Sequence, residues 1–409
     1  MKKTLTKISL ALSLAVAMCS CGDDRSGEYF ELTKENQWIY SQMKDCYLWG
    51  DSIKEPSQSN FFATGEQFFG KLLYKSDKAS YYGSVANEDT YGMRVSLMRD
   101  PLGFTPAKVY ALIEYVEPLS AAANAGLERG MYISKMNGAT LNMGVSQALK
   151  SGAEKEIEVC SIVFDDETEE YAWSAPTTVI LPASAPVEPA SVLLATVIEG
   201  TRTSLGYIIC NGFDNESAVE DINAALLNFA AVGVNNIILD LRYNQSNNLT
   251  NAISIASSFV PAEKHGTLFC TLYKDLKMLT SETKQFVACE PVAANIPVYI
   301  ITTERTEGVC SALVRAIRIA RGTTDVKVVG KTASTDNLLT ETFASPYDFN
   351  INPVTALIYD AAGNALSPVA PDYDADEFAD LKHVYPLGNR QEHIINSINY
   401  LIANGTMPE

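Results

Sequence analysis

The second half of the chain alternates short apolar runs with stretches in which apolar residues recur at helical spacing. Helices are expected near 216–231, near 250–259 and directly after Gly308. Strands are expected in the apolar runs around them, which read LGYIICNGF, NNIILDLRYN, IPVYIITTE and VKVVGK. This alternation predicts an α/β fold with a largely parallel sheet and helices on its faces. Functional loops would then lie at the carboxyl ends of the strands.

The first part of the chain follows a helical pattern. From Thr33, the expected cap, apolar and aromatic residues recur every three or four positions, at Ile39, Met43, Cys46 and Tyr47. A second helix is expected in GEQFFGKLLYKS. Residues 22–87 are therefore predicted to form an N-terminal helical segment. A segment of this size is too small to fold alone and should pack on a larger body.

Residues 88–182 carry short β-rich runs broken by Gly, Pro and Asn. The stretch YVEPLSAAANAGLERGMYISKMNGATL resembles the core of a PDZ domain, although Ala121 replaces a proline of the usual pattern and Met131 an aspartate. The matching residues are Val116, Pro118, Ser120, Ala122, Ala125, Gly126, Leu127, Gly130, Asn137 and Gly138. A PDZ fold adds an extended peptide to a sheet edge, so the resemblance implies polypeptide binding. The binding loop would be 91–95 or 101–104, and a β domain that serves only as a spacer is the alternative.

The amino terminus has the pattern of a secretory signal. Lysines precede an apolar run over residues 8–18, which is too short to span a bilayer. Cys21, followed by Gly and two Asp, resembles the lipidation site of bacterial envelope lipoproteins, and Cys19 is the less favoured acceptor. Residues 1–21 are therefore predicted as a lipoprotein signal peptide. The protein is expected in the cell envelope, periplasmic or surface-exposed, and attached to the membrane through the lipid alone; a plain signal peptide cut elsewhere is the alternative.

The composition restricts the partners. The formal net charge is −18, which would repel nucleic acid and anionic membranes, so no nucleic-acid partner is expected. The cysteines form no CxxC pair, and His265, His383 and His393 have no ligand-like neighbours. Neither a metal nor another cofactor is therefore expected.

Six stretches in a fixed order resemble the carboxyl-terminal processing (tail-specific) serine peptidases. They read GYIICNGF, IILDLRYN, TTERT, VVGKT, APDYD and YPLGNRQEHIINSINYL. The resemblance implies a crotonase-like α/β core over residues 190–405 with an inserted β-rich, PDZ-like domain over residues 88–182. It covers nearly the whole chain after the signal peptide and implies polypeptide, or a protein carboxyl terminus, as the partner.

In that family a serine attacks the peptide carbonyl, a lysine takes its proton, and amides of a glycine-rich turn hold the oxyanion. Gly308 stands at the serine position of this chain, and Thr335 stands at the lysine position. The Gly-Gly of the oxyanion turn is replaced, since Gln245, Ser246 and Asn247 follow Asn244. All three parts of the family's catalytic apparatus have therefore changed, which predicts a catalytically inactive protein that binds polypeptide.

An active serine endopeptidase with a relocated site is the alternative. Ser311 lies one helical turn beyond Gly308, and Lys331 is the nearest amine, so these two residues would form the new pair. Cys310 lies about 200° around the helix from Gly308 and should face the core. Asp240 and Arg242 are expected to form a structural ion pair rather than to bind substrate. A purely structural envelope protein, without peptide affinity, is a third hypothesis.

Overall fold

The computed structural model describes residues 26–84, 89–199 and 204–408, which form two compact units. One unit contains the described residues up to Gly83 together with Thr342–Pro353, and the other contains the rest. Cys21 and the predicted signal peptide lie outside the described residues. Within the described ranges, no helix combines the length and the apolar character that crossing a membrane requires.

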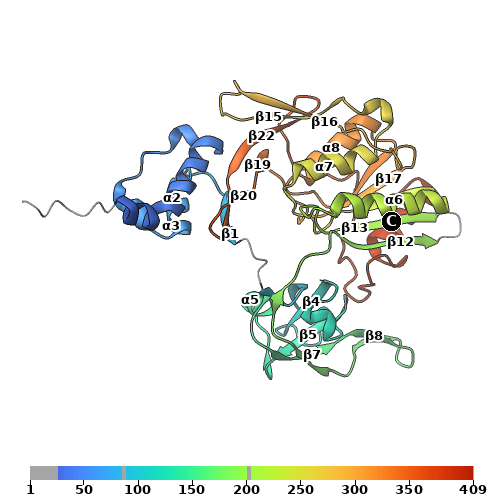
Figure 1. Ribbon diagram of the computed structural model, residues 1–409. Helices are drawn as coiled ribbons and strands as arrows, with labels where there is room; N and C mark the ends of the chain where they lie inside the picture. The colour runs from blue at the N-terminus through green and yellow to red at the C-terminus, as the bar shows by residue number, and fades with distance from the viewer. Residues whose placement is uncertain (1–25, 85–88, 200–203, 409) are drawn as a thin grey trace, which may run out of the picture. The chain divides into compact units, whose positions relative to one another are not determined.

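The first unit packs helices beside a small sheet (Figure 1). The α3 helix begins where Thr64 accepts a hydrogen bond from the Gln67 amide. The expected cap at Thr33 is wrong, because α2 begins at Ser26 and the Thr33 hydroxyl donates back to the Tyr29 carbonyl, 2.7 Å away. The elements are α2 (Ser26–Cys46), η1 (Gly50–Ser52), η2 (Gln58–Phe62), α3 (Gly65–Leu72), β1 (Tyr81–Ser84), β20 (Phe343–Ala344) and β21 (Phe349–Asn352).

The segment 342–353 completes the first unit, although the sequence analysis assigned it to the α/β region of 190–405. Its strand β21 lies between β1 and β20 in a three-stranded sheet. The Phe349 ring stacks on Tyr82 with ring centroids 5.0 Å apart and meets Trp38 edge-on at 5.6 Å. Aromatic contacts therefore join the helical segment to this distant part of the chain.

The β-rich part of the second unit is an antiparallel sheet in the order β10-β7-β5-β4-β3, with β3 at its edge. A hairpin turn lies at Asn137-Gly138, where both residues have positive φ, at +49° and +75°, and join β5 to β6. The elements are β2 (Asp89–Thr90), β3 (Met93–Arg99), β4 (Val109–Val116), α4 (Ala121–Asn124), β5 (Tyr132–Met136), β6 (Ala139–Thr140), α5 (Ser146–Lys150), β7 (Lys155–Cys160), β8 (Ile162–Asp165), β9 (Glu170–Trp173), β10 (Thr177–Leu181) and β11 (Ala185–Pro186).

The α/β part of the second unit contains a six-stranded sheet in the order β12-β13-β14-β17-β18-β23. Only the β12–β13 pair is antiparallel, and the other pairs of this sheet are parallel, which confirms the largely parallel sheet predicted from the sequence. The strands are β12 (Val192–Glu199), β13 (Ser204–Cys210), β14 (Asn236–Asp240), β17 (Val298–Thr302), β18 (Val326–Gly330) and β23 (Tyr373–Asp374).

Helices cover both faces of this sheet. Ile208 and Ile237 belong to the core shared with α6, α7 and α8, whereas Tyr207 and Ile238 pack with α9. Because successive strand residues point to opposite faces, such strands must be apolar on both sides, as their continuous hydrophobic runs are. The helices are α6 (Ala218–Val232), α7 (Leu249–Ser258), α8 (Cys310–Arg321) and α9 (His393–Asn404). Figure 1 shows α6, α7 and α8 together beside β13 and β17.

A four-stranded sheet in the order β16-β15-β22-β19 completes the second unit. Its elements are η3 (Ala262–Lys264), β15 (Leu268–Tyr273), β16 (Ser281–Gln285), β19 (Leu338–Thr340) and β22 (Val354–Asp360). The loops after β13, β14, β17 and β18 leave the parallel sheet at one edge, because the carboxyl ends of parallel strands lie together. Gly308, Thr335 and the 244–248 turn are all in these loops.

Candidate functional site

The structure brings Gly308, Thr335 and the 244–248 turn together. The Glu307 amide donates to the Asn244 carbonyl at 2.9 Å, and the Val309 amide donates to the Ser246 carbonyl, also at 2.9 Å. The Thr335 hydroxyl lies 3.3 Å from the Gly308 carbonyl oxygen and donates to it. Three segments that are far apart in the sequence therefore occupy one place at the sheet edge.

Gly308 has no space for a side chain. Its φ is +63°, a conformation that residues with a β-carbon rarely adopt. A β-carbon built there would lie 2.2 Å from the Ser246 carbonyl oxygen and 2.8 Å from Oδ1 of Asn247. A serine at 308 would therefore force the neighbouring turn to move.

Three amides of the 244–248 turn donate hydrogen bonds to side-chain oxygens of the protein. The Ser246 amide donates to Oδ1 of Asn244 at 3.1 Å. The amides of Asn247 and Asn248 both donate to Oδ1 of Asp214, at 3.0 and 2.9 Å. An internal carboxylate thus binds two amides of this turn, one of them at Asn247, a predicted oxyanion-turn position.

Ser311 and Lys331 are not joined in this structure. Ser311 is fully buried in α8, and its hydroxyl has no hydrogen-bond partner among the described residues. The Lys331 ammonium pairs with Asp374 at 2.5 Å, and this hydrogen bond raises the pKa of the lysine. A lysine with a raised pKa is protonated at neutral pH and cannot accept the proton of a serine.

Two thiols lie beneath the turn. Cys310 is fully buried, as its helical position predicted, and its Sγ donates to Oδ1 of Asn244 at 3.1 Å. Burial raises the pKa of Cys310 well above its usual value and raises the pKa of Cys210 to about 12. Both thiols are therefore neutral near pH 7, and neither provides a thiolate nucleophile.

The predicted ion pair of Asp240 and Arg242 is confirmed. The two fully buried side chains are 2.7 Å apart, and the Tyr207 hydroxyl donates to the same carboxylate at 2.8 Å. Arg242 also lies 2.9 Å from Glu392 and 3.2 Å from Glu377. Burial opposes the charge of Arg242, but these carboxylates outweigh that effect and raise its pKa well above the usual value. The pair is buried beneath the loops, and neither residue lines the pocket described next.

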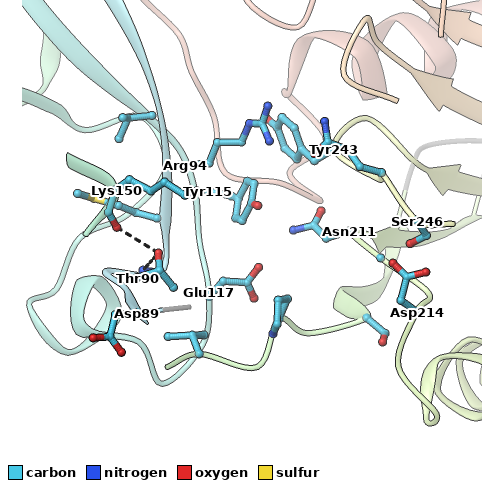
Figure 2. A pocket seen from close by; sticks show the side chains of 18 of the residues that line it. Asp89, Thr90, Arg94, Tyr115, Glu117, Lys150, Asn211, Asp214, Tyr243 and Ser246 are labelled. Carbon is cyan, nitrogen blue, oxygen red and sulfur yellow. Dashed lines mark hydrogen bonds between the residues drawn. The ribbon is translucent and has the colours of Figure 1, made fainter. Parts of the chain in front are cut away.

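A pocket of 740 Å³ lies between these loops and the β-rich part of the same unit (Figure 2). Gln245 and Ser246 line it from one side, and residues 92–95, which lead into and begin β3, line it from the other. Of the two candidate peptide-binding loops, 91–95 therefore contributes to the pocket, whereas 101–104, also in the described structure, does not. The remaining lining residues are Asp89, Thr90, Tyr115, Glu117, Ser146, Leu149, Lys150, Val187, Pro189, Ser191, Asn211, Gly212, Asp214, Asn215 and Tyr243.

Glu117 is the most enclosed carboxylate of the pocket, with 7% of its surface exposed. The Ala190 amide donates to its Oε2 at 3.1 Å. Burial raises the pKa of Glu117, and desolvation inside the pocket likewise raises the pKa of Asp214 in spite of its two amide donors.

Glu117, Asn211 and Asp214 are site residues that sequence reasoning missed. Asn211 and Asp214 follow β13 directly, so the rule that ligands bind beyond the carboxyl ends of parallel strands could have indicated them. Glu117 follows β4 of the antiparallel sheet, and only the tertiary structure brings it to the pocket.

Comparisons with known proteins agree with this architecture. The model of the peptidase S41 N-terminal domain matches residues 34–82, and the model of peptidase family S41 matches residues 204–375. Together they cover more than half of the chain, and the α/β core with its β-rich insertion and helical N-terminal segment is the fold of these proteins. The chain belongs to peptidase family S41.

Solved structures of this family are similar over nearly the whole chain. An S41 protease from Bacteroides fragilis is 25% identical, with a TM-score of 0.75, and the match covers 90% of this chain and 97% of that one. A photosystem II D1 C-terminal processing protease is 13% identical, with a TM-score of 0.49, over 84% of this chain and 93% of that one. A search of curated proteins found no match.

Proposed function

We propose that this protein is a catalytically inactive S41 peptidase that binds polypeptide. The observation that carries the proposal is the contact at Gly308, where the Ser246 carbonyl oxygen fills the space that the first side-chain atom of a nucleophile would need. The loss of the nucleophile therefore involves the packing of two loops as well as the absence of one hydroxyl.

The bound turn amides support the same proposal. Hydrolysis of a peptide passes through a negatively charged tetrahedral intermediate that needs free hydrogen-bond donors. Here the Asp214 carboxylate holds the amides of Asn247 and Asn248, and it would repel a second anion. Removing one oxyanion donor from an active peptidase typically costs about 10²–10³ in turnover, so the occupied turn adds to the missing nucleophile.

Polypeptide binding is supported by the architecture of the pocket. The strand β3 is the edge of its sheet, and its first residues line the pocket. An edge strand offers unpaired amides and carbonyls to an extended peptide, as in PDZ domains. The similar solved structure from Bacteroides fragilis is described as an S41 protease, and proteases act on polypeptide.

The absence of hydrolysis can be tested with a serine-directed fluorophosphonate and an unfolded protein substrate. We expect neither labelling of the chain nor specific cleavage over a day. Labelling of Ser311 would instead establish the active alternative with a relocated site. A Ser311→Ala variant is the control, since it removes that hydroxyl.

Binding can be tested on a peptide array with a variant that fills the pocket. Ser146 is exposed on α5 and lines the pocket, so Ser146→Trp should reduce peptide capture. Met143 is also exposed, at 58%, but does not line the pocket, so Met143→Trp should leave capture unchanged. Equal capture by both variants would contradict the pocket as the binding site. No capture by the unaltered protein would favour the purely structural hypothesis.

We further propose that Cys21 carries a lipid that anchors the protein in the bacterial envelope. Support comes from the short apolar run and the Cys-Gly-Asp-Asp sequence that follows it. Cells fed labelled palmitate should incorporate label into the protein and into a Cys19→Ser variant. Cys21→Ser should lose the label, and its persistence there would refute this site.

A further inference from the structure

The pocket holds carboxylates that its own cations do not neutralise. Asp89, Glu117 and Asp214 line it together with Arg94 and Lys150. The Arg94 guanidinium is paired with the buried Glu114, 3.1 Å away, and Glu114 also binds Arg305. Lys150 and Asp89 both line the opposite wall from Asp214 (Figure 2). Arg94 is thus paired with Glu114 rather than with Glu117 or Asp214, the two carboxylates of interest here.

Glu117 and Asp214 accept hydrogen bonds from backbone amides of the chain. Among the described residues, no cationic side chain forms a salt bridge with either carboxylate. A carboxylate offers about four lone-pair sites, and the Ala190 amide and the Asn211 side chain leave about two of those of Glu117 open. Glu117 is buried, and a buried carboxylate without a cation is costly unless a partner binds it, whereas Asp214 is exposed at the mouth of the same pocket.

Asn211 is a second, independent indication of a ligand. It lies between Glu117 and Asp214 in Figure 2. Its amide group hydrogen-bonds Glu117, whereas its buried Oδ1 has no hydrogen-bond partner among the described residues. Buried polar atoms are nearly always paired in folded proteins, so this oxygen marks a position where a ligand group is missing. Its Oδ1 can accept a hydrogen bond from a cationic donor.

We propose that the pocket binds a lysine or arginine side chain of the polypeptide, with the cationic group between Glu117, Asp214 and the Asn211 amide oxygen. This inference rests on the proposed function. Long basic side chains bury their apolar stems and place the charge at the tip, and the Tyr115 ring in the same pocket offers a surface for the stem. The edge strand β3 beside the pocket can pair with a peptide main chain, which favours a peptide over a small free amine as the ligand.

The test compares peptides that differ in one residue. Fluorescein-labelled nine-residue alanine–threonine peptides carry a central lysine, or norleucine as its uncharged counterpart, and anisotropy measures their binding to the full mature chain. We expect the lysine peptide to bind at least about tenfold more tightly, and the preference to weaken in 0.5 M salt because the charges are then screened. Equal binding of both peptides would overturn the inference but leave the proposed function standing. No binding of either peptide up to 1 mM would instead count against the proposed function.

Two isosteric variants locate the cationic group. Glu117→Gln and Asp214→Asn keep an oxygen that accepts from the backbone amides, so both should fold. Each should weaken lysine-peptide binding about tenfold and leave norleucine-peptide binding unchanged. Glu167→Gln and Asp166→Asn, on an exposed turn outside the pocket, are the matched controls and should change neither. Unaltered lysine-peptide binding in both pocket variants would overturn the assignment, as would spermidine competing as strongly as the peptide itself.

Discussion

Ser246 and Gly308 meet through main-chain atoms, and this contact determines what a substitution at the site can achieve. The Ser246 carbonyl accepts a hydrogen bond from the Val309 amide, which holds it directly over Gly308. Buried main-chain groups of this kind are costly to leave unpaired, so the turn does not simply swing away. A side chain at position 308 is thus opposed by the Ser246 backbone as well as by the Asn247 side chain.

Restoring the family's catalytic residues should therefore fail. We expect Gly308→Ser combined with Thr335→Lys to show no peptidase activity. We also expect Gly308→Ser to lower the free energy of unfolding by about 1–2 kcal/mol from the positive φ and by about 1–3 kcal/mol more from the clash. Urea denaturation measures this loss. Gly233→Ser is the control, because Gly233 has a φ of +75° with open space around it. This variant should show only the loss of about 1–2 kcal/mol that comes from the positive φ.

Glu117 should show the conflict between stability and binding that is common at functional sites. Burial raises its pKa, so the charged form near pH 7 opposes folding. Glu117→Gln removes this charge and should raise the free energy of unfolding by about 0.5–2 kcal/mol. Thermal unfolding followed by circular dichroism checks the result. A decrease in stability would mean that a cation within the protein already compensates the carboxylate.

At the scale of elements, a buried charge network joins the end of β14 to the rest of the second unit. Arg242 binds Asp240 just before it in the chain, as well as Glu377 and the α9 cap Glu392. Arg129 from the β-rich part reaches the same Glu377 at 2.8 Å. These groups are nearly or completely buried, so each depends on its partners for charge compensation.

Breaking this network should be costly. Arg242→Met leaves three buried carboxylates short of a cation and should lower the free energy of unfolding by about 3–5 kcal/mol. Arg318 pairs with Asp372 at 2.7 Å on a partly exposed helix face, so Arg318→Met should cost less than about 1 kcal/mol. Chemical denaturation of the two variants provides the comparison. Similar losses would contradict the structural role of the buried network.

The network also predicts sensitivity to acid. Burial disfavours the charge of Glu377, but Arg242 and Arg129 outweigh it, so its pKa in the folded protein lies below the usual 4.5. A lowered pKa stabilises the fold above pH 4.5, and this contribution is lost as the pH falls through the folded value. Glu377→Gln should therefore flatten the dependence of the melting temperature on pH below about 5. Glu117→Gln should not, because the pKa of Glu117 is shifted upward.

The core elements could be predicted because local pattern and tertiary role agree in them. The helices α6, α7 and α8 lie close to the ranges expected from apolar spacing, and each buries the face that this spacing indicates. The start of α2 could not be predicted in this way. Thr33 is a residue type that often caps helices, but here the helix continues through it. The pairing of β21 with β1 joins distant segments, which no local pattern encodes.

The candidate site was predicted only in part. Motif order placed Gly308, Thr335 and the 244–248 turn together, and the structure joins them by hydrogen bonds. The roles of Asp214 and Asn211 depend on which amides their side chains reach, or fail to reach, in the folded chain. Such contacts follow from loop conformation, which sequence spacing does not determine.

At the scale of the whole second unit, charged and aromatic side chains hold the β-rich part against the α/β part. The Tyr132 hydroxyl donates to the Leu381 carbonyl at 2.7 Å, and Tyr171 contacts His383 at 2.8 Å. Arg129 contributes more, because its guanidinium meets the Tyr243 hydroxyl as well as Glu377. The pocket between the two parts depends on these contacts for its shape.

Weakening these contacts should loosen the pocket without unfolding the sheet. Arg129→Met should increase amide hydrogen exchange in β3, β4 and the 376–386 loop by about tenfold, since about 1.4 kcal/mol of lost opening energy corresponds to that factor. Mass spectrometry of exchanged peptides measures this. Arg99→Met, at an exposed position of β3, is the control and should change little. If hydrogen exchange increased only next to residue 129, the result would argue against an interface shared by the β-rich part and the α/β part.

The strand partners that residues 342–353 supply to β1 affect the order in which the molecule can mature. During synthesis from the amino terminus, α2 and α3 emerge early but remain without Phe349 until some 270 further residues have followed. A product truncated before residue 342 would thus carry an intact amino-terminal sequence and an incomplete amino-terminal unit. In such a truncated chain, the aromatic residues that normally pack against Phe349 would be exposed to proteases that degrade incomplete proteins.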